Sequence, residues 1–214
     1  MLDSVVLPLL AFAVAAGLLT LTPGVDTAIV LRSAAALGQR AGAAAGAGVC
    51  AGLFLWGAGA AFGLGALLAA SAKAYLALKW VGAAYLVYLG VRLIANPRSA
   101  PPDAGATPVP GAANPARSAL WRGFLTNVLN PKVGVFYATF LPQFIPNGAN
   151  VVAFSALLTA VHVALTALWF ALLVALTAPL GRWLRRPATM RALDRLTGCV
   201  FIGFGVKLAL ADRG

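Results

Sequence analysis

The amino-acid sequence predicts an all-α integral membrane protein with about six transmembrane helices, arranged as a 3+3 inverted repeat with two proline-broken helices. Of the 214 residues, 61% are hydrophobic and only 10% are charged, whereas a soluble domain carries about 25% charged residues. Residues 41–72 and 133–181 contain no charged residue, and about 20 apolar residues span the hydrocarbon core of a bilayer. Proline interrupts two of the apolar segments at corresponding places in the two halves.

Six apolar segments follow one another along the chain. We expect spans near residues 5–37 (interrupted), 42–70, 74–95, 121–145 (interrupted), 150–179 and 192–211. No basic region precedes the first segment, so we expect a retained span rather than a cleaved signal peptide. Residues 96–119 are rich in Pro, Ala and Gly, which predicts an extended linker. The chain thus divides into a three-helix repeat over residues 1–95, the linker, and a second three-helix repeat over residues 120–214.

The two halves share one plan. Each begins with a proline-interrupted helix, broken at Pro23 or at Pro131, and each continues through a polar turn to a long uncharged span and a shorter one. The last spans also share a local signature, Gly90-Val91-Arg92-Leu93 and Gly205-Val206-Lys207-Leu208. Because three spans is an odd number, the second half enters the membrane the opposite way up. Many secondary transporters are built on such inverted repeats.

The net charge of +11 arises from basic residues scattered between apolar segments, which argues against a nucleic-acid partner and favours contact with membrane lipids. Eleven basic residues belong to the first, third and fifth loops, and four belong to the opposite side. The eleven are Arg32, Arg40, Arg92, Arg98, Arg117, Arg122, Arg182, Arg185, Arg186, Arg191 and Arg195, and the four are Lys73, Lys79, Lys207 and Arg213. This bias predicts that the linker is cytoplasmic and that both termini lie on the external side of the membrane.

Small residues form a stripe on the second span. Gly48, Gly52, Gly59 and Gly63 fall on one helix face, and small residues let helices approach closely in lipid. We expect internal packing; the same stripe could instead serve a homodimer.

Asp26 is the only acidic residue that lies well inside an apolar segment, and both proline breaks stand near the middle of the bilayer. Thr22-Pro23 and Asn130-Pro131 each resemble an N-cap followed by proline at the first helical position. The helix dipole would favour Asp26 in the first turn. Helix capping does not explain why Asp26 lies near the middle of the bilayer. An ionisable group at that depth normally faces a cavity with a functional task.

Lys132 is harder to explain by local stability, because a cation in the first turn opposes the helix dipole. It could snorkel to the interface, pair with Asp26 or hold an anionic substrate. Asn127 and Asn130 share a helix face and either line the same cavity or serve in capping and interhelical hydrogen bonds. His162 is the only histidine; it could relay protons or pack as a hydrogen-bonded core residue. Gly24 completes the first break.

Several segments resemble the amino-acid exporter family typified by the lysine and the homoserine/threonine exporters, the LysE/RhtB type. They are Leu21-Thr22-Pro23-Gly24-Val25-Asp26, Leu78-Lys79-Trp80-Val81-Gly82-Ala83-Ala84-Tyr85-Leu86, Leu89-Gly90-Val91-Arg92-Leu93, Gly123-Phe124, Asn130-Pro131-Lys132 and Phe140-Leu141-Pro142-Gln143-Phe144. The resemblance covers nearly the whole chain and implies a multi-pass exporter of amino acids or related metabolites in the bacterial inner membrane, driven by protons. It adds Gln143 as a candidate. This chain has Val25 where many relatives have a second proline.

The resemblance and the residues together suggest a mechanism. An amino-acid zwitterion would bind between the breaks, its carboxylate facing the backbone N–H groups of residues 23–25 and 131–133 with help from Lys132, and its ammonium facing Asp26, which would exchange a proton. Thr22, Pro23, Gly24, Asn127, Asn130 and Pro131 complete the expected site.

Other function classes fit the sequence less well. We expect no enzyme, because HExxH is absent and one intramembrane aspartate cannot form an aspartyl dyad. Cys50 and Cys199 form no CxxC motif, which argues against a thiol–disulfide or electron carrier. We expect no cofactor or metal, because the spans lack clustered His, Cys and carboxylates. An exporter of a cation or another small solute is the main alternative.

Overall fold

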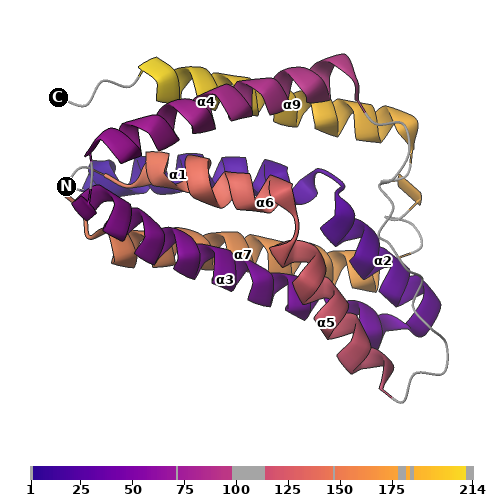
Figure 1. Ribbon diagram of the computed structural model, residues 1–214. Coiled ribbons are helices and arrows are strands. Elements are labelled where there is room, and N and C mark those ends of the chain that lie inside the picture. Colours follow the sequence, from indigo (N-terminus) through magenta and orange to yellow (C-terminus); the bar gives the residue numbers. More distant parts are fainter. Residues whose placement is uncertain are drawn as a thin grey trace.

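The computed structural model describes residues 2–70, 72–97, 114–146, 148–177, 182–183 and 186–210. Every regular element in these ranges is helical (Figure 1). In chain order they are α1 (Leu2–Leu21), α2 (Val25–Leu37), α3 (Gln39–Ala70), α4 (Ala72–Ala95), α5 (Pro115–Val128), α6 (Pro131–Val135), the π-helical turn η1 (Phe136–Phe140), the 3-10 turn η2 (Leu141–Phe144), α7 (Val151–Ala175) and α9 (Pro187–Leu210).

The predicted spans correspond closely to these helices. The first predicted span is α1 and α2, bent by 53° at its break, and the fourth is α5 followed by α6, η1 and η2. Several boundaries differ by a few residues, and α9 begins at Pro187 rather than at residue 192. The largest difference is that α5 begins at Pro115, inside the range predicted as linker, because Asn114 caps it through a hydrogen bond from the Arg117 N–H and Pro115 suits the first turn. Residues 98–113 of the predicted linker lie outside the described residues.

Length and apolar composition single out fewer spans than the six predicted. Within the described residues, α3 over Gln39–Gly63 and α7 over Val151–Ala175 are each long and apolar enough to cross a membrane, and the bent α1–α2 pair makes a third if it is one span. The outer surface supports a lipid environment, since large apolar side chains such as Leu7, Phe62 and Leu168 are 69–72% exposed. The protein is therefore a membrane protein that is helical throughout its described regular elements, and the six-span count stays a prediction.

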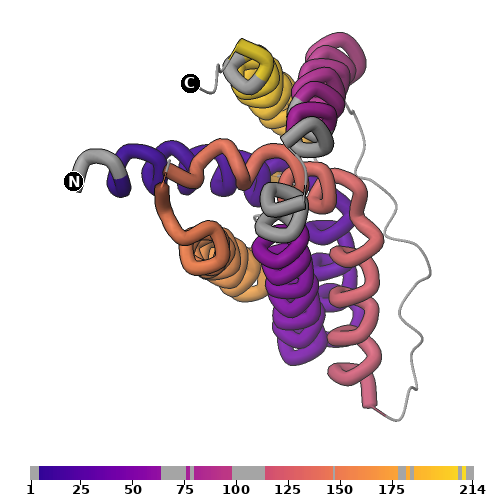
Figure 2. The backbone as a smooth tube through the Cα atoms, turned by 60° about the vertical axis from the view of Figure 1, so that its left-hand side comes forward, coloured from indigo at the N-terminus to yellow at the C-terminus, as the bar shows by residue number. Residues whose placement is uncertain are grey.

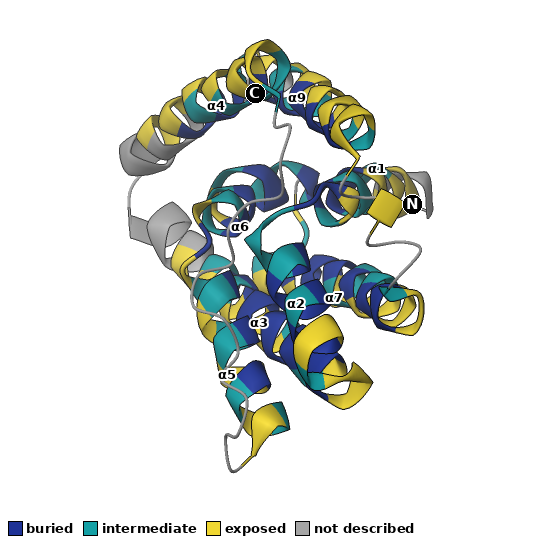
Figure 3. Cartoon of the chain, turned by 90° about the vertical axis from the view of Figure 1, so that its right-hand side faces the viewer, coloured by how far each residue is buried: buried dark blue, intermediate teal, exposed yellow. Residues whose placement is uncertain are grey.

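The helices form three layers (Figures 1 and 2). The α4 and α9 helices pack along each other on one side, while α3 and α7 pack together on the other side with α2 and α5. Between them lie α1 and the α6–η1 segment, the parts that continue from the two breaks. One part of each broken helix therefore lies in the middle layer, and Figure 3 shows buried residues concentrated on the inward faces.

Among the described residues, the core consists of two apolar clusters. The first is built around aromatic rings of α1, η1 and η2, with Phe12, Phe136 and Phe140 all buried; the rings of Phe136 and Phe140 are stacked, with centroids 5.0 Å apart. The second joins α2, α3 and α7 through residues such as Ile29 and Leu173. Both breaks lie between these clusters, and this position determines where the polar residues gather.

Candidate functional site

The first break separates α1 from α2 at residues 22–24. Thr22 continues α1, because its N–H and its hydroxyl both donate to the Leu18 carbonyl, at 3.0 and 2.7 Å. Gly24, in an extended conformation, is the N-cap of α2, and no side chain caps that helix. The prediction that Thr22 caps the helix is therefore wrong, because its hydroxyl is already engaged by α1. Asp26 lies in the first turn of α2, as predicted.

The second break is capped as the sequence predicts. Asn130 is the N-cap of α6, with Pro131 in the first turn, and its side-chain oxygen accepts from the Lys132 N–H at 3.1 Å. The Val133 N–H donates to the Asn130 carbonyl at 3.1 Å. The expectation that residues 131–133 offer N–H groups to a substrate is therefore wrong, because Asn130 accepts two of them and proline has none.

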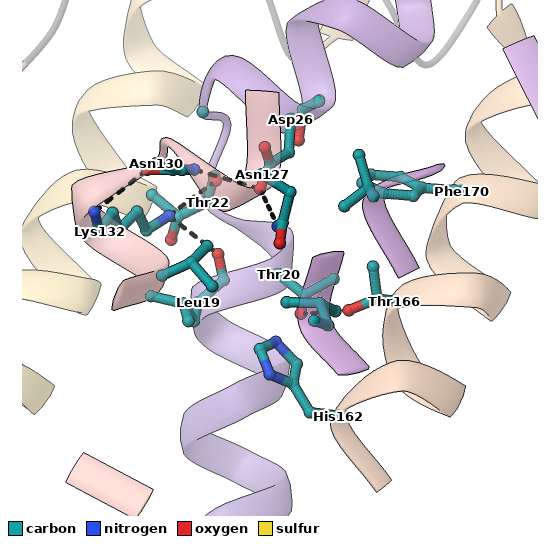
Figure 4. A pocket seen from close by; sticks show the side chains of 15 residues that line it. Leu19, Thr20, Thr22, Asp26, Asn127, Asn130, Lys132, His162, Thr166 and Phe170 are labelled. Carbon is teal, nitrogen blue, oxygen red and sulfur yellow. Dashed lines mark hydrogen bonds between the residues drawn. The ribbon is translucent and has the colours of Figure 1, made fainter. Parts of the chain in front are cut away.

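The two breaks meet at Asp26. Its Oδ2 accepts hydrogen bonds from the side-chain amides of Asn127 at 2.9 Å and Asn130 at 3.1 Å (Figure 4). Its Oδ1 and the Asn127 Oδ1 are both buried and have no hydrogen-bond partner. Buried polar atoms are nearly always hydrogen-bonded, so two neighbouring orphan acceptors call for an explanation. They suit a ligand that brings hydrogen-bond donors.

Lys132 extends its ammonium toward the C-terminal end of α1, where it donates to the carbonyls of Leu19 at 3.0 Å and Thr22 at 3.3 Å. A cation at a helix C-terminus is favoured by the helix dipole, so α1 offsets the unfavourable position of Lys132 at the start of α6. Its charge still attracts that of Asp26 across the site. Lys132 therefore points inward and bridges the two halves rather than snorkelling to the interface.

A small cavity lies at this junction, where the two apolar clusters meet. Its walls come from the breaks and from α3 and α7: Leu19, Thr20, Thr22, Gly24, Asp26, Thr27, Val49, Leu53, Asn127, Asn130, Lys132, Val133, His162, Thr166 and Phe170. The cavity volume is about 30 Å³, enough for one or two water molecules. We call this cavity the polar pocket. It is too small to hold an amino acid without some movement of its walls.

Comparison with known proteins identifies the family. The model of the LysE type translocator family matches residues 18–212. The chain belongs to the LysE type translocator family. No solved structure matches this translocator.

Its relatives include amino-acid efflux proteins. The chain is 30% identical to the homoserine/homoserine lactone efflux protein of Salmonella typhi, over 94% of this chain and 95% of that protein. It is 30% identical to the leucine efflux protein of Enterobacter sp. (strain 638), over 92% of this chain and 93% of that protein. It is also 31% identical to the membrane protein YrhP of Bacillus subtilis (strain 168), over 95% and 99%. This LysE-type chain is thus similar over nearly its full length to efflux proteins.

Most of the site residues predicted from sequence come together in this translocator. Thr22, Gly24, Asp26, Asn127, Asn130, Lys132 and His162 all line the polar pocket, while Pro23, Pro131 and Gln143 do not. The prolines set the breaks instead. The Gln143 amide donates to the Thr139 carbonyl at 3.0 Å within its own turn. His162 is also packed between rings, and its Nδ1 lies 3.2 Å from the Tyr137 hydroxyl.

Sequence reasoning missed part of the pocket wall. Thr20 and Thr166 face each other with hydroxyls 3.3 Å apart, and because Thr20 donates to the Ala16 carbonyl, Thr166 is the donor. The signal was the spacing of His162, Thr166 and Phe170, four residues apart on one face of an apolar helix. Val49 and Leu53 of α3 also line the pocket and were not singled out from the sequence.

Asp194 is a further buried polar residue that the sequence did not single out. Arg191 and Arg195 stand close to it in the chain, yet its side chain is fully buried on α9. Met190, Asp194, Thr197 and Phe201 are all buried, and their 4-3-4 spacing was the available signal for an inward face. The Thr197 hydroxyl bonds that of Thr22 and so connects α9 to the first break.

Proposed function

We propose that this LysE-type protein exports amino acids or related small metabolites across the bacterial inner membrane by proton antiport. One observation carries the proposal: Asp26 Oδ1 and Asn127 Oδ1 are buried, unpartnered acceptors in a pocket between two broken helices. A primary ammonium group has three donors and a positive charge, which complements a carboxylate oxygen beside an amide oxygen.

The same carboxylate can couple substrate to protons. An ammonium group and a proton both neutralise Asp26 and therefore compete for it. When a proton from outside binds the carboxylate, the ion pair is lost and the ammonium is released; when that proton leaves to the cytoplasm, the charged site takes up the next substrate. Asn127 and Asn130 donate to the other oxygen of Asp26, which leaves Oδ1 for the ammonium or the proton.

The substrate's carboxylate is assigned to the beginning of α2. That helix has no side-chain cap, and exposed N–H groups at a helix N-terminus attract anions. Lys132 adds positive charge on another wall of the pocket. This assignment replaces the symmetric one drawn from sequence, because Asn130 occupies the N–H groups of the second break.

Alternating access would use the two halves of the chain. The order of a broken helix, a long helix and a further helix occurs twice, in α1–α4 and in α5–α9, which is consistent with a 3+3 inverted repeat rocking about a central site. A pocket of about 30 Å³ corresponds to a closed state. The charge bias of the loops supports a cytoplasmic linker and external termini.

Asp26→Asn tests the proposal most directly. The amide carries no charge to pair with an ammonium and takes up no proton near neutral pH. Export should therefore fall to the level of cells without the protein, while the abundance of the variant in the membrane stays normal. The measurement is amino-acid accumulation in the medium of cells that express either form. Asp103→Asn removes the same charge from the predicted linker and should export normally.

A metabolite profile of medium from cells with and without the protein identifies the substrate class. An amino acid that depends on the protein and stops with a protonophore supports the proposal. Full export by Asp26→Asn contradicts it. A difference confined to inorganic cations would instead support the cation exporter.

A further inference from the structure

Phe170 on α7 separates the polar pocket from a much larger apolar groove. The groove runs between α3 and α7 and measures about 620 Å³. Phe170 lines both cavities, and only 5% of its side chain is exposed. Its ring is therefore part of the wall between a polar compartment and an apolar one.

The polar pocket must enlarge before an amino acid fits, and Phe170 is the wall residue best suited to move. Hydrogen bonds hold Asp26 to the two asparagines and Lys132 to the end of α1. Phe170 has only an apolar ring, which turns about its side-chain torsions without breaking a hydrogen bond. Figure 4 shows it at one edge of the pocket, with Asp26 and Asn127 between it and Lys132.

The groove side of Phe170 is bounded by Gly46 of α3. A Cβ built on Gly46 would lie 3.2 Å from the Phe170 Cβ and 3.4 Å from its ring Cδ2, so the ring packs against this glycine and any side chain there would crowd it. The α3 residues that line the groove on either side of Gly46 in the sequence, Ala43 and Ala47, are small. Outward rotation therefore meets no large side chain on this part of α3.

The lining of the groove indicates what it accepts. Apart from Gln39, its residues are Ala43, Gly46, Ala47, Cys50, Ala51, Phe54, Val163, Ala167, Phe170, Ala171, Val174 and Ala175. Burying apolar surface there is favourable, at about 25 cal/mol per Å², whereas a polar side chain would lose its hydrogen bonds to water.

We propose that Phe170 is a gate whose outward rotation joins the polar pocket to the groove, and that the groove receives the substrate's side chain while Asp26 holds its ammonium. This inference rests on the proposed function and names its substrate class: amino acids with bulky apolar side chains. Phe170 is then a specificity-determining residue, and Gly46 provides the space for its movement.

The test is efflux from proteoliposomes that contain the full chain and an inward proton gradient, loaded with alanine, leucine, phenylalanine or glutamine. The wild type should export leucine about tenfold faster than glutamine, which has a similar size. Phe170→Ala should raise phenylalanine efflux relative to alanine about tenfold, and Phe170→Trp should lower it by a similar factor. Gly46→Val keeps the ring but fills its space, so it should resemble Phe170→Trp.

Phe62→Ala is the matched control, because Phe62 is a 69%-exposed phenylalanine of α3 outside both cavities; it should leave the substrate ranking unchanged. If Phe170→Ala does not fold, Phe170→Leu and Gly46→Val decide the question. A uniform change for all four substrates, or equal export of leucine and glutamine, overturns the inference. In that case an inactive Asp26→Asn still supports amino-acid export. Wild-type vesicles that export none of the four overturn the inference as well, and the metabolite profile then decides the proposed function separately.

Discussion

Asp26 shows how a single carboxylate can be held and still be available to a ligand. One oxygen accepts from Asn127 and Asn130, and the other has no partner. An unpartnered buried polar group costs about 1–3 kcal/mol, a cost that a bound ammonium or proton removes. The asparagines keep the carboxylate in place, so ligand exchange at Oδ1 does not require the site to be rebuilt.

Asn130 has two separable tasks, capping α6 through its oxygen and holding Asp26 through its amide. We predict that Asn130→Asp keeps the cap but lowers export at least about tenfold, because the amide donor, worth about 1.5–3 kcal/mol to a charged acceptor, is lost. Asn130→Ala should lower export similarly and also reduce stability by about 1 kcal/mol. Export assays and thermal unfolding in detergent measure the two effects.

Asn150 provides the matched control for this pair. It caps α7 through a hydrogen bond from the Ala153 N–H at 2.9 Å and is exposed. Asn150→Ala should therefore lower stability by about 1 kcal/mol and leave export unchanged. Normal export by Asn130→Asp would separate Asn130 from the function of Asp26.

At the scale of elements, the glycines of α3 allow the second break to approach closely. A Cβ on Gly48 would collide with the α5 backbone at Leu120, and a Cβ on Gly52 would lie 2.5 Å from the Asn127 Oδ1. A Cβ built on Gly59 or on Gly63 would have nothing within 4 Å. The predicted stripe therefore serves internal packing at two of its four glycines, and it gives Asn127 the room to reach Asp26.

Gly52→Ala should impair transport through Asn127. The added methyl pushes the Asn127 amide away from Asp26 and breaks its hydrogen bond to the carboxylate. Because such a bond contributes about 1.5–3 kcal/mol, we expect export to fall about tenfold or more. Gly59→Ala adds the same methyl where nothing lies within 4 Å and should export normally. Initial efflux rates at equal protein abundance compare the two, and equal rates would contradict the role of Gly52.

At the scale of the whole molecule, the site depends on the two halves coming together. Leu19, Leu53 and Val133 belong to the aromatic-rich cluster, while Val49 and Phe170 belong to the other, and all five line the polar pocket. A pocket between two apolar clusters can change shape while each cluster stays packed. This arrangement suits a transporter that closes around its substrate.

Topology is the corresponding prediction. The distribution of basic residues predicts that the linker is cytoplasmic and that both termini lie on the external side of the membrane. Alkaline phosphatase fused after Gly214 should therefore be active, and a fluorescent protein inserted after Gly105 should fluoresce. A fusion after Gly214 that behaves as cytoplasmic would reverse the orientation and the assigned direction of proton flow.

Local chemistry explains why much of the fold could be predicted. Long uncharged segments separated by Arg-rich or Pro-rich stretches predict helices and their order, and Asn130-Pro131 predicts a capped helix start, because these signals act within a few residues. Thr22-Pro23 misled for the same reason: its local pattern fits a cap, but the hydroxyl is engaged by α1. The early start of α5 at Pro115 was missed because an alanine- and proline-rich stretch lacks apolar periodicity.

The sequence by itself determined that this protein is helical and apolar, that two helices break near Asp26 and Lys132, and that it resembles LysE-type exporters. Only the tertiary structure decided how those breaks are used. It turned Lys132 toward the end of α1, directed Asn127 and Asn130 to one oxygen of Asp26, and set Phe170 between two cavities. The physical reason is that burial and hydrogen-bond partners come from residues far apart in the chain. Asp26 is separated by 101 positions from Asn127 and by 104 positions from Asn130.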